Sequence, residues 1–347
     1  MEKFWVKNYD KGVAPEIDLS EYDSLGQVIQ EVFDKYSDKP AFHNMGTTLS
    51  YDQIRIASLK FASYLQNDLG LQKGDRVALM MPNILQYPIC LFGILQAGMV
   101  AVNVNPLYTA RELEHQLNDS ESSTIVIFDN SAHILESIVS NTKIKNIITT
   151  EIGDLLNFPK SLIVNFVLKH VKKMVPKYSL GNAISIKDIL AEGDISSFKA
   201  PQVSKEDIAF LQYTGGTTGV SKGAILTHSN IISNLLQART WISNLIRKGE
   251  EIIITPLPLY HIFSLTANCL AFSSVGALNI LITNPRDLPG FIKELKKWKF
   301  TAFTGVNTLF NGLINNPEFK NIDFSKLRLT LGGGMAVQQS VAEKWKE

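Results

Sequence analysis

The sequence contains very little cysteine. Cys90 and Cys269 are the only two cysteines among 347 residues, and each lies inside an apolar run. Isolated cysteines in such runs are expected to be buried thiols. Two buried cysteines cannot form a disulfide framework, and they are too few for a structural zinc site made of cysteine thiolates. The first twelve residues also lack the apolar core of a signal peptide, so we expect a reducing, cytoplasmic setting.

An excess of charge of either sign is also missing. The formal net charge is +1, which offers no electrostatic argument for a nucleic-acid partner. Apolar residues form 45% of the chain and charged residues 19%, a balance typical of a globular protein with a large interior. The length exceeds what one hydrophobic core usually serves. We therefore expect two packed units, at residues 1–200 and 201–347.

Two long stretches, residues 77–110 and 252–285, contain no Asp, Glu, Lys or Arg. Their length alone would allow membrane spans. However, prolines and asparagines interrupt both stretches, and short β-rich runs alternate with turn residues inside them. Buried strands and helices of a large core fit this pattern better.

Apolar strand patterns alternate with helical patterns along the chain. Strands are expected at residues 77–81, 99–104, 124–128 and 208–213, and helices at residues 24–36, 50–69, 84–96, 111–118 and 337–345. Such alternation is typical of an α/β fold with βαβ units on a mostly parallel sheet.

Residues 160–177 differ from the rest, because they combine five lysines and no acid with many apolar side chains. A basic, strongly apolar helix of this kind could lie on an anionic membrane surface as a peripheral contact. The alternative is a surface helix that docks on the body of the protein with its lysines outward. The sequence leaves both interpretations open.

A glycine- and threonine-rich loop lies between two predicted strands. Its glycines let the backbone approach a ligand closely, and successive exposed amides can bind an anion. The hydroxyl groups add hydrogen-bond donors, and Lys222 adds a compact cation. The loop therefore predicts a polyphosphate-binding site, made by Tyr213, Thr214, Gly215, Gly216, Thr217, Thr218, Gly219, Val220, Ser221, Lys222, Gly223 and Ala224.

Other glycine motifs fit this loop less well. A Walker A loop needs Ser or Thr after its Gly-Lys pair, whereas Lys222 follows Ser221 and precedes Gly223. The dinucleotide fingerprint G-x-G-x-x-G is absent here and at residues 332–334. Residues 219–223 do match the hydrolase pattern G-x-S-x-G, which would make Ser221 a nucleophile. That hypothesis also needs an acid and a later histidine, and only His228 and His261 follow.

The run 213–224 resembles the phosphate-binding signature of the acyl-adenylate-forming (AMP-binding) superfamily, which includes acyl-CoA synthetases, luciferases and peptide-synthetase adenylation domains. Residues 49–51, 105–120, 257–263 and 332–335 are similar to further core motifs of that superfamily, in the same order. Residues 283–287 and 304–310 look most like bacterial long-chain fatty acyl-CoA ligases. The resemblance implies the large N-terminal domain of this fold, with two mostly parallel sheets flanked by helices.

The resemblance also implies a two-step reaction that uses ATP, Mg²⁺, a fatty acid and coenzyme A. The fatty acid is first adenylated with loss of pyrophosphate, and the thiol of coenzyme A then displaces AMP. By this resemblance Thr214 shares the metal, and His261 is the catalytic residue beside the acyl carboxylate. The expected substrate-binding residues are His261, Leu265, Gly305, Val306, Gly332, Gly333 and Gly334. Relatives are often homodimers, so a homodimer is a further expectation.

Later motifs of the superfamily do not occur in these 347 residues, among them the Tyr-Gly-x-Thr-Glu whose glutamate would hold magnesium. We therefore expect an incomplete second unit, an absent C-terminal domain and no turnover of ATP and palmitate by this polypeptide alone. Two other hypotheses stay open. One is an adenylate-forming ligase that loads a carrier protein, and the other is a non-catalytic dimerisation fragment.

Overall fold

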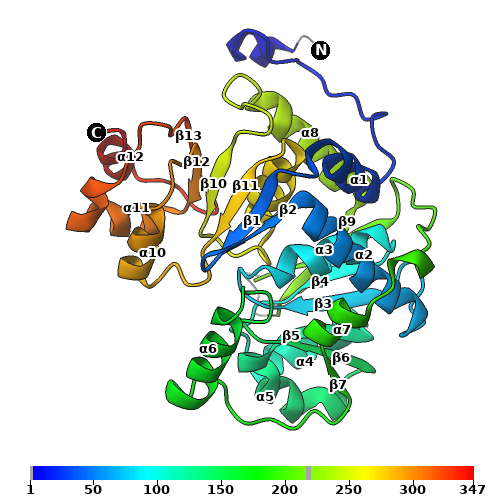
Figure 1. Ribbon diagram of the computed structural model, residues 1–347. Coiled ribbons are helices and arrows are strands. Elements are labelled where there is room, and N and C mark those ends of the chain that lie inside the picture. Colours follow the sequence, from blue (N-terminus) through cyan, green and yellow to red (C-terminus); the bar gives the residue numbers. More distant parts are fainter. Residues whose placement is uncertain (1–2, 216–219) are drawn as a thin grey trace.

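The computed structural model describes residues 3–215 and 220–347, which form two sheets with helices around and between them (Figure 1). The larger sheet contains β3 (Arg76–Met80), β4 (Val100–Asn103), β5 (Thr124–Phe128), β6 (Asn146–Thr150), β7 (Ala183–Ser185), β8 (Ile208–Thr214) and β9 (Lys222–Thr227). The smaller sheet contains β1 (Pro40–Asn44), β2 (Thr47–Ser50), β10 (Ile252–Thr255), β11 (Leu278–Leu281), β12 (Ala302–Gly305) and β13 (Leu329–Gly332).

The strand order is β7-β6-β5-β3-β4-β8-β9 in the larger sheet and β13-β12-β10-β11-β1-β2 in the smaller one. Neighbouring strands run parallel, except in the hairpins β1–β2 and β8–β9. The predicted α/β fold with two mostly parallel sheets flanked by helices is confirmed. Parallel strands are covered on both faces, which explains why β3 and β5 are nearly continuous apolar runs.

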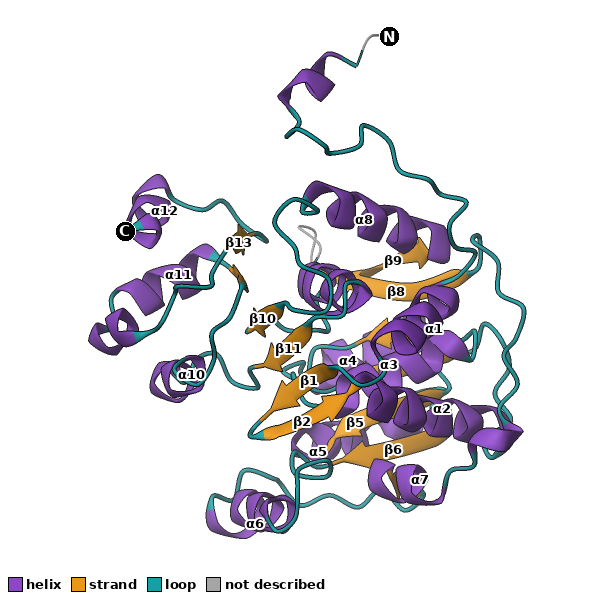
Figure 2. Cartoon of the chain, turned by 45° about the horizontal axis from the view of Figure 1, so that its top comes forward, coloured by secondary structure: helices purple, strands orange, loops and turns teal. Residues whose placement is uncertain are grey.

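The α-helices cover the sheets or pack between them (Figure 2). They are α1 (Leu25–Tyr36), α2 (Tyr51–Asn67), α3 (Gln86–Gln96), α4 (Ala110–Asp119), α5 (Asp129–Ile138), α6 (Lys160–Phe166), α7 (Ile186–Glu192), α8 (His228–Trp241), α9 (Ile262–Ser264), α10 (Leu288–Leu295), α11 (Asn307–Ile314) and α12 (Gln339–Lys346). Capping boxes at Ser50, Thr109 and Thr227 fix where α2, α4 and α8 begin, because each side chain accepts a backbone N–H of the first turn.

The sheets cross the expected division of the chain at residue 200. The β1–β2 hairpin comes from the first 50 residues, yet it pairs with β11 in the smaller sheet. The β8–β9 hairpin comes after residue 200, yet it pairs with β4 in the larger sheet. Each sheet therefore completes itself with a hairpin from the other part of the chain, so neither sheet is built from residues 1–200 or 201–347 alone.

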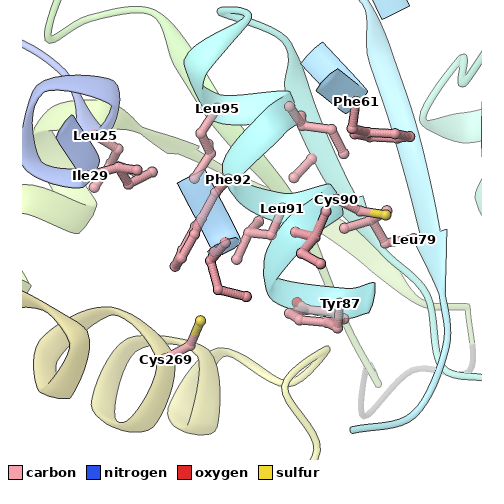
Figure 3. Packing of buried hydrophobic residues seen from close by; sticks show 14 of the residues in the cluster. Leu25, Ile29, Phe61, Leu79, Tyr87, Cys90, Leu91, Phe92, Leu95 and Cys269 are labelled. Atoms are coloured by element: carbon pink, nitrogen blue, oxygen red, sulfur yellow. The ribbon is translucent and has the colours of Figure 1, made fainter. Parts of the chain in front are cut away.

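The charge-free stretches form the shared core. Every residue of α3 is buried, and its side chains pack among residues from both sheets (Figure 3). Cys90 lies on this helix, and Cys269 lies in the π-helical segment Leu265–Phe272, which faces it; both are buried free thiols, as predicted. None of the helices in the described part of the chain is long and apolar enough to cross a membrane.

A buried histidine links the starts of two helices and predicts a pH-dependent stability. His228 is 1% exposed, and its Nδ1 accepts the backbone N–H of Leu25 at 3.1 Å. Burial lowers the pKa of His228 from 6.5 to about 4, although Asp207 opposes this shift. Because the unfolded chain binds the proton more tightly, this contribution to stability is present above pH 6.5 and is lost as the pH falls towards 4. The expected loss is about 3 kcal/mol.

Urea unfolding of the wild type and of His228→Gln across this pH range measures the effect. The wild type should lose more stability than the variant between pH 6.5 and pH 4, because glutamine does not titrate there. Equal pH dependence in the two proteins would contradict the assignment.

Candidate active site

The predicted phosphate-binding loop connects β8 to β9 at the edge of the larger sheet. Thr214 and Lys222 are direct partners in the antiparallel register, so their side chains lie on the same face at the base of the loop. Both residues are exposed, and Lys222 forms no ion pair with any residue in 3–215 or 220–347. Gly215, Val220, Ser221, Gly223 and Ala224 complete the described part of the loop, whereas Gly216, Thr217, Thr218 and Gly219 lie outside the described residues.

Helix α4 holds the base of the loop in place. The hydroxyl of Tyr213 donates to Asp119 Oδ2 at 2.6 Å, and burial together with this contact raises the pKa of Tyr213. His115 Nε2 donates to the carbonyl oxygen of Ser221 at 2.9 Å. A Cβ at Gly223 would lie 2.9 Å from the ring of Tyr213, so glycine is needed there. These contacts fix the two strands that bring Thr214 and Lys222 together.

A chain of buried polar side chains connects this loop strand to the smaller sheet. Asn103 Nδ2 donates to Gln212 Oε1 at 3.0 Å, and Gln212 Nε2 donates to the carbonyl oxygen of Tyr260 at 3.0 Å. The Tyr87 hydroxyl lies 2.7 Å from Asn103 Oδ1 and 2.8 Å from the carbonyl oxygen of Leu259. The position of the 256–261 loop is therefore fixed relative to the phosphate-binding loop.

Asn83 fixes the same loop from the other side. Its Nδ2 donates to the carbonyl oxygens of Thr255 at 3.0 Å and Leu257 at 2.8 Å, and its Oδ1 accepts the N–H of Leu259 at 2.8 Å. Asn83 is 3% exposed, so water cannot replace these three bonds. One side chain that follows β3 therefore binds three backbone groups at the end of β10 and just after it.

His261 lies at the end of this loop and begins α9. Its Nδ1 accepts the N–H of Phe263 at 3.3 Å, so the neutral ring carries its proton on Nε2. The side chain is exposed, and Nε2 makes no hydrogen bond with the residues that the structure describes. His261 therefore presents a free donor next to Tyr260, whose carbonyl group is tied to β8.

The glycines of β12 and β13 lie together beside α9. Gly305 and Gly332 are register partners, and a Cβ at Gly305 would lie 2.7 Å from the ring of Phe310. A Cβ at Gly333 would lie 2.7 Å from the ring of Phe263, two residues after His261. Gly334 has a φ of +76° and approaches Val306, at the N-terminus of α11. The predicted acyl-pocket residues Gly305, Val306, Gly332, Gly333 and Gly334 are thus brought together with the loop that carries His261.

Leu265 occupies a different environment from these glycines. Its side chain is fully buried and belongs to the main hydrophobic cluster, directly after α9. It begins the π-helical segment Leu265–Phe272, a wide type of turn that is often found at functional sites. The structure therefore places Leu265 behind the loop of His261, and its expected contact with an acyl chain stays a prediction.

A cavity of about 210 Å³ lies where the carboxyl ends of strands from both sheets converge. Its lining includes Pro82 and Asn83 after β3, Pro106 after β4, Tyr260 after β10 and Arg286 after β11. Ligands of parallel α/β sheets bind outside the carboxyl ends of the strands. Residues from the motif segments 105–120, 257–263 and 283–287 line this cavity, whereas the described part of the phosphate-binding loop and residues 332–334 do not.

The hydrolase interpretation finds no support in the geometry. The carbonyl group of Ser221 accepts from His115, while the Nδ1 atoms of His228 and His261 accept backbone N–H groups elsewhere. Neither of the two later histidines forms a hydrogen bond with Ser221 in the described part of the chain. A serine nucleophile requires such a base, so these contacts do not support Ser221 as a nucleophile.

These residues provide only part of a magnesium-binding site. Mg²⁺ is usually held by one or two carboxylates together with substrate phosphates. Within residues 3–215 and 220–347, no group of three or more His, Cys, Asp or Glu side chains is arranged to hold a metal ion. The hydroxyl of Thr214 therefore fits a metal that arrives with the phosphates, not one that the protein holds alone.

Sequence reasoning missed the residues that connect the loops, namely Asn83, Tyr87, Asn103, Gln212 and Asn268. Asn268, for example, bridges β10 and β12, because it donates to the carbonyl oxygen of Ile254 at 3.2 Å and accepts from Thr304 Oγ1 at 2.9 Å. The available signal was a polar side chain inside an apolar run. Such a side chain must find a buried partner, but the sequence does not show which one.

Comparisons with known proteins agree with this architecture. Residues 29–347 match the family described as AMP-binding enzyme. The chain is 56% identical to a long-chain-fatty-acid–CoA ligase of Yersinia pestis over 346 residues, which cover 100% of the chain and 62% of that protein. It is 32% identical to a long-chain-fatty-acid–CoA ligase of Bacillus subtilis over 100% of the chain and 61% of that protein. The chain thus spans about three fifths of these relatives.

Solved structures show the same fold at lower identity. An anthranilate CoA ligase in complex with anthranoyl-AMP superposes with a TM-score of 0.81 at 20% identity, over 95% of this chain and 59% of that one. A long-chain-fatty-acid–CoA ligase of Archaeoglobus fulgidus superposes with a TM-score of 0.78 at 23% identity, over 97% of this chain and 62% of that one. With the family match over residues 29–347, the chain belongs to the AMP-binding enzyme family.

Proposed function

We propose that the complete protein is an ATP-dependent long-chain fatty acid–CoA ligase that works through an acyl-adenylate. The observation that carries this proposal is the pairing of Thr214 with Lys222 at the base of a glycine-rich loop. An exposed ammonium group beside hydroxyl and amide donors suits a polyphosphate. The relative from Yersinia pestis, 56% identical to this chain, is a long-chain-fatty-acid–CoA ligase.

In the first proposed step, a carboxylate oxygen of the fatty acid attacks the α-phosphorus of ATP. The bond from that phosphorus to the bridging oxygen breaks, and pyrophosphate leaves with the electron pair. In the second step, the thiolate of coenzyme A attacks the acyl carbon, and AMP leaves. Little covalent chemistry falls to the protein, so its main tasks are to position the reactants and to stabilise charge.

The residues divide between these tasks. Thr214, Thr217, Thr218 and Lys222 hold the phosphates, and a magnesium ion bound to those phosphates would supply further positive charge. His261 donates from Nε2 to the acyl carboxylate or the adenylate, because its Nδ1 is already occupied. Gly305, Val306, Gly332, Gly333 and Gly334 border the acyl group, and the glycines among them let neighbouring side chains such as Phe263 and Phe310 pack directly against the backbone.

Long-chain fatty acids as substrates also suggest the cellular role. We propose that the complete protein acts in the cytoplasm and supplies acyl-CoA for β-oxidation. The charge-balanced, cysteine-poor composition fits a reducing compartment.

An ATP–pyrophosphate exchange assay on the complete protein tests the function. Incubation with ATP, labelled pyrophosphate and carboxylic acids of rising chain length should give exchange that is fastest with long-chain acids. Coenzyme A should then release AMP and acyl-CoA. Exchange without release by coenzyme A would favour a ligase that loads a carrier protein. No exchange with any acid would favour a non-catalytic dimerisation fragment.

A further inference from the structure

The segment after β6 exposes apolar side chains in an unusual concentration. None of the residues of α6 is buried, and a π-helical turn, Val167–Val171, continues the helix. The helix expected over residues 160–177 therefore ends early. The large exposed apolar side chains of residues 158–177 are Phe158 (81% exposed), Leu162 (55%), Ile163 (56%), Phe166 (60%), Val171 (64%) and Met174 (52%).

Polar groups, and not these apolar side chains, attach the segment to the body. Asn165 Oδ1 accepts the N–H of Gly153 at 2.7 Å, and Asn165 Nδ2 donates to Asp154 at 3.3 Å. Asn130 donates to the carbonyl oxygen of Met174 at 2.9 Å, and Lys169 lies 3.6 Å from Glu151. A helix docked on a soluble protein normally turns its apolar face inward. Here Leu162, Ile163 and Phe166 are exposed, and even Val164 and Leu168 are only half-buried.

The charge on the same segment has one sign. Residues 160–177 contain five lysines and no acid. Lys172, Lys173 and Lys177 are exposed and form no ion pair with the residues that the structure describes. Apolar side chains surrounded by unpaired lysines complement a surface that is apolar inside and anionic outside, which is the chemistry of an acidic lipid bilayer.

We propose that residues 158–177 form a membrane-docking surface for anionic lipids. Phe158, Leu162, Ile163 and Phe166 enter the region between head groups and acyl chains, and the lysines contact the phosphates. This inference goes beyond the ligase activity, since lipid binding requires no turnover.

The docking surface lies at the same edge of the larger sheet as the phosphate-binding loop. The segment follows the carboxyl end of β6, and the phosphate-binding loop follows the carboxyl end of β8. These ends lie at the same edge of the larger sheet, because β6, β5, β3, β4 and β8 run parallel. In Figure 1, α6 projects from the lower part of the molecule, far from the N-terminal residues at the top. Docking would thus place the ligand-binding edge near the bilayer.

Vesicle co-sedimentation of the complete protein tests the proposal. Vesicles of phosphatidylcholine mixed with phosphatidylglycerol in equal parts should bind the protein, and vesicles of phosphatidylcholine alone should bind it more weakly. Leu162→Gln/Phe166→Gln should lower binding to the mixed vesicles by about tenfold or more, because two exposed apolar side chains no longer enter the bilayer. Lys172→Glu/Lys173→Glu should lower it by a similar factor and remove most of its salt dependence.

Matched variants elsewhere control for general changes in apolarity and charge. Phe4→Gln/Leu19→Gln removes the same two residue types from exposed positions, 67% and 43% exposed. Lys7→Glu/Lys11→Glu makes the same change of charge at exposed positions. Both controls should bind mixed vesicles like the wild type. Equal binding by Leu162→Gln/Phe166→Gln and its control would overturn the proposal. The proposal would also be overturned if the wild type did not bind anionic vesicles but formed a dimer, and if Leu162→Gln/Phe166→Gln made that dimer dissociate.

Discussion

Replacing Lys222 by alanine in the complete protein is expected to slow ATP–pyrophosphate exchange by about 100- to 1,000-fold, the usual effect of removing one preorganised charge-stabilising group. Lys222 is exposed, lies beside Thr214 across the hairpin, and has no acidic partner among the described residues. Its charge is therefore available to a ligand and contributes nothing to an internal ion pair. The fold should be unaffected, so the midpoint of urea unfolding should stay within experimental error of the wild type.

Lys248→Ala provides the control for loss of a lysine. Lys248 is also exposed and forms no ion pair with the described residues, but it lies beyond α8, between that helix and β10. The ATP–pyrophosphate exchange rate of the Lys248→Ala variant should equal that of the wild type. If Lys222→Ala exchanged as fast as Lys248→Ala, the hairpin would not hold the phosphates.

Asn83→Ala is expected to destabilise the protein by about 2 kcal/mol, because a buried polar group left without a partner costs about 1–3 kcal/mol. The substitution would leave the N–H of Leu259 without an acceptor. The carbonyl groups of Thr255 and Leu257 would lose one of two donors, because they also accept from Ile282 N–H and the Ser264 hydroxyl. It would also release the loop that ends in His261, so exchange should fall even at temperatures where the variant stays folded. Urea unfolding and the exchange assay measure the two effects separately.

Asn244→Ala is the matched control for an asparagine that bonds to the backbone. Asn244 is exposed and donates a single hydrogen bond to the carbonyl oxygen of Lys11 at 3.1 Å. Water can replace that bond, so the stability should change by no more than about 0.5 kcal/mol. Equal stability of the two variants would show that Asn83 does not fix the loop.

Local patterns in the sequence predicted local structure well. The helix expected at residues 24–36 begins at Leu25 after the cap Ser24, and the strand expected at 208–213 is Ile208–Thr214. The hairpin around the phosphate-binding loop followed from turn residues between two apolar runs. These features depend on neighbours in the chain, so a single sequence contains the information.

Long-range pairings could not be predicted in the same way. The β1–β2 hairpin pairs with β11, which lies more than 200 residues later. The edge strands of both elements need hydrogen-bond partners, but nothing in their two sequences identifies the partner. Tyr87 and Leu259 meet across 172 positions. The segment at 160–177 shows a related limit. Its composition allowed two opposite orientations, and only the structure shows that Leu162, Ile163 and Phe166 are exposed while Asn165 contacts the body.

A crystal structure of the complete protein with a non-hydrolysable ATP analogue and magnesium would test the central claim most directly. We expect the phosphates to lie against the β8–β9 hairpin, with the Lys222 ammonium and the Thr214 hydroxyl within hydrogen-bonding distance of phosphate oxygens. A triphosphate bound at any other place, with this hairpin empty, would contradict the account.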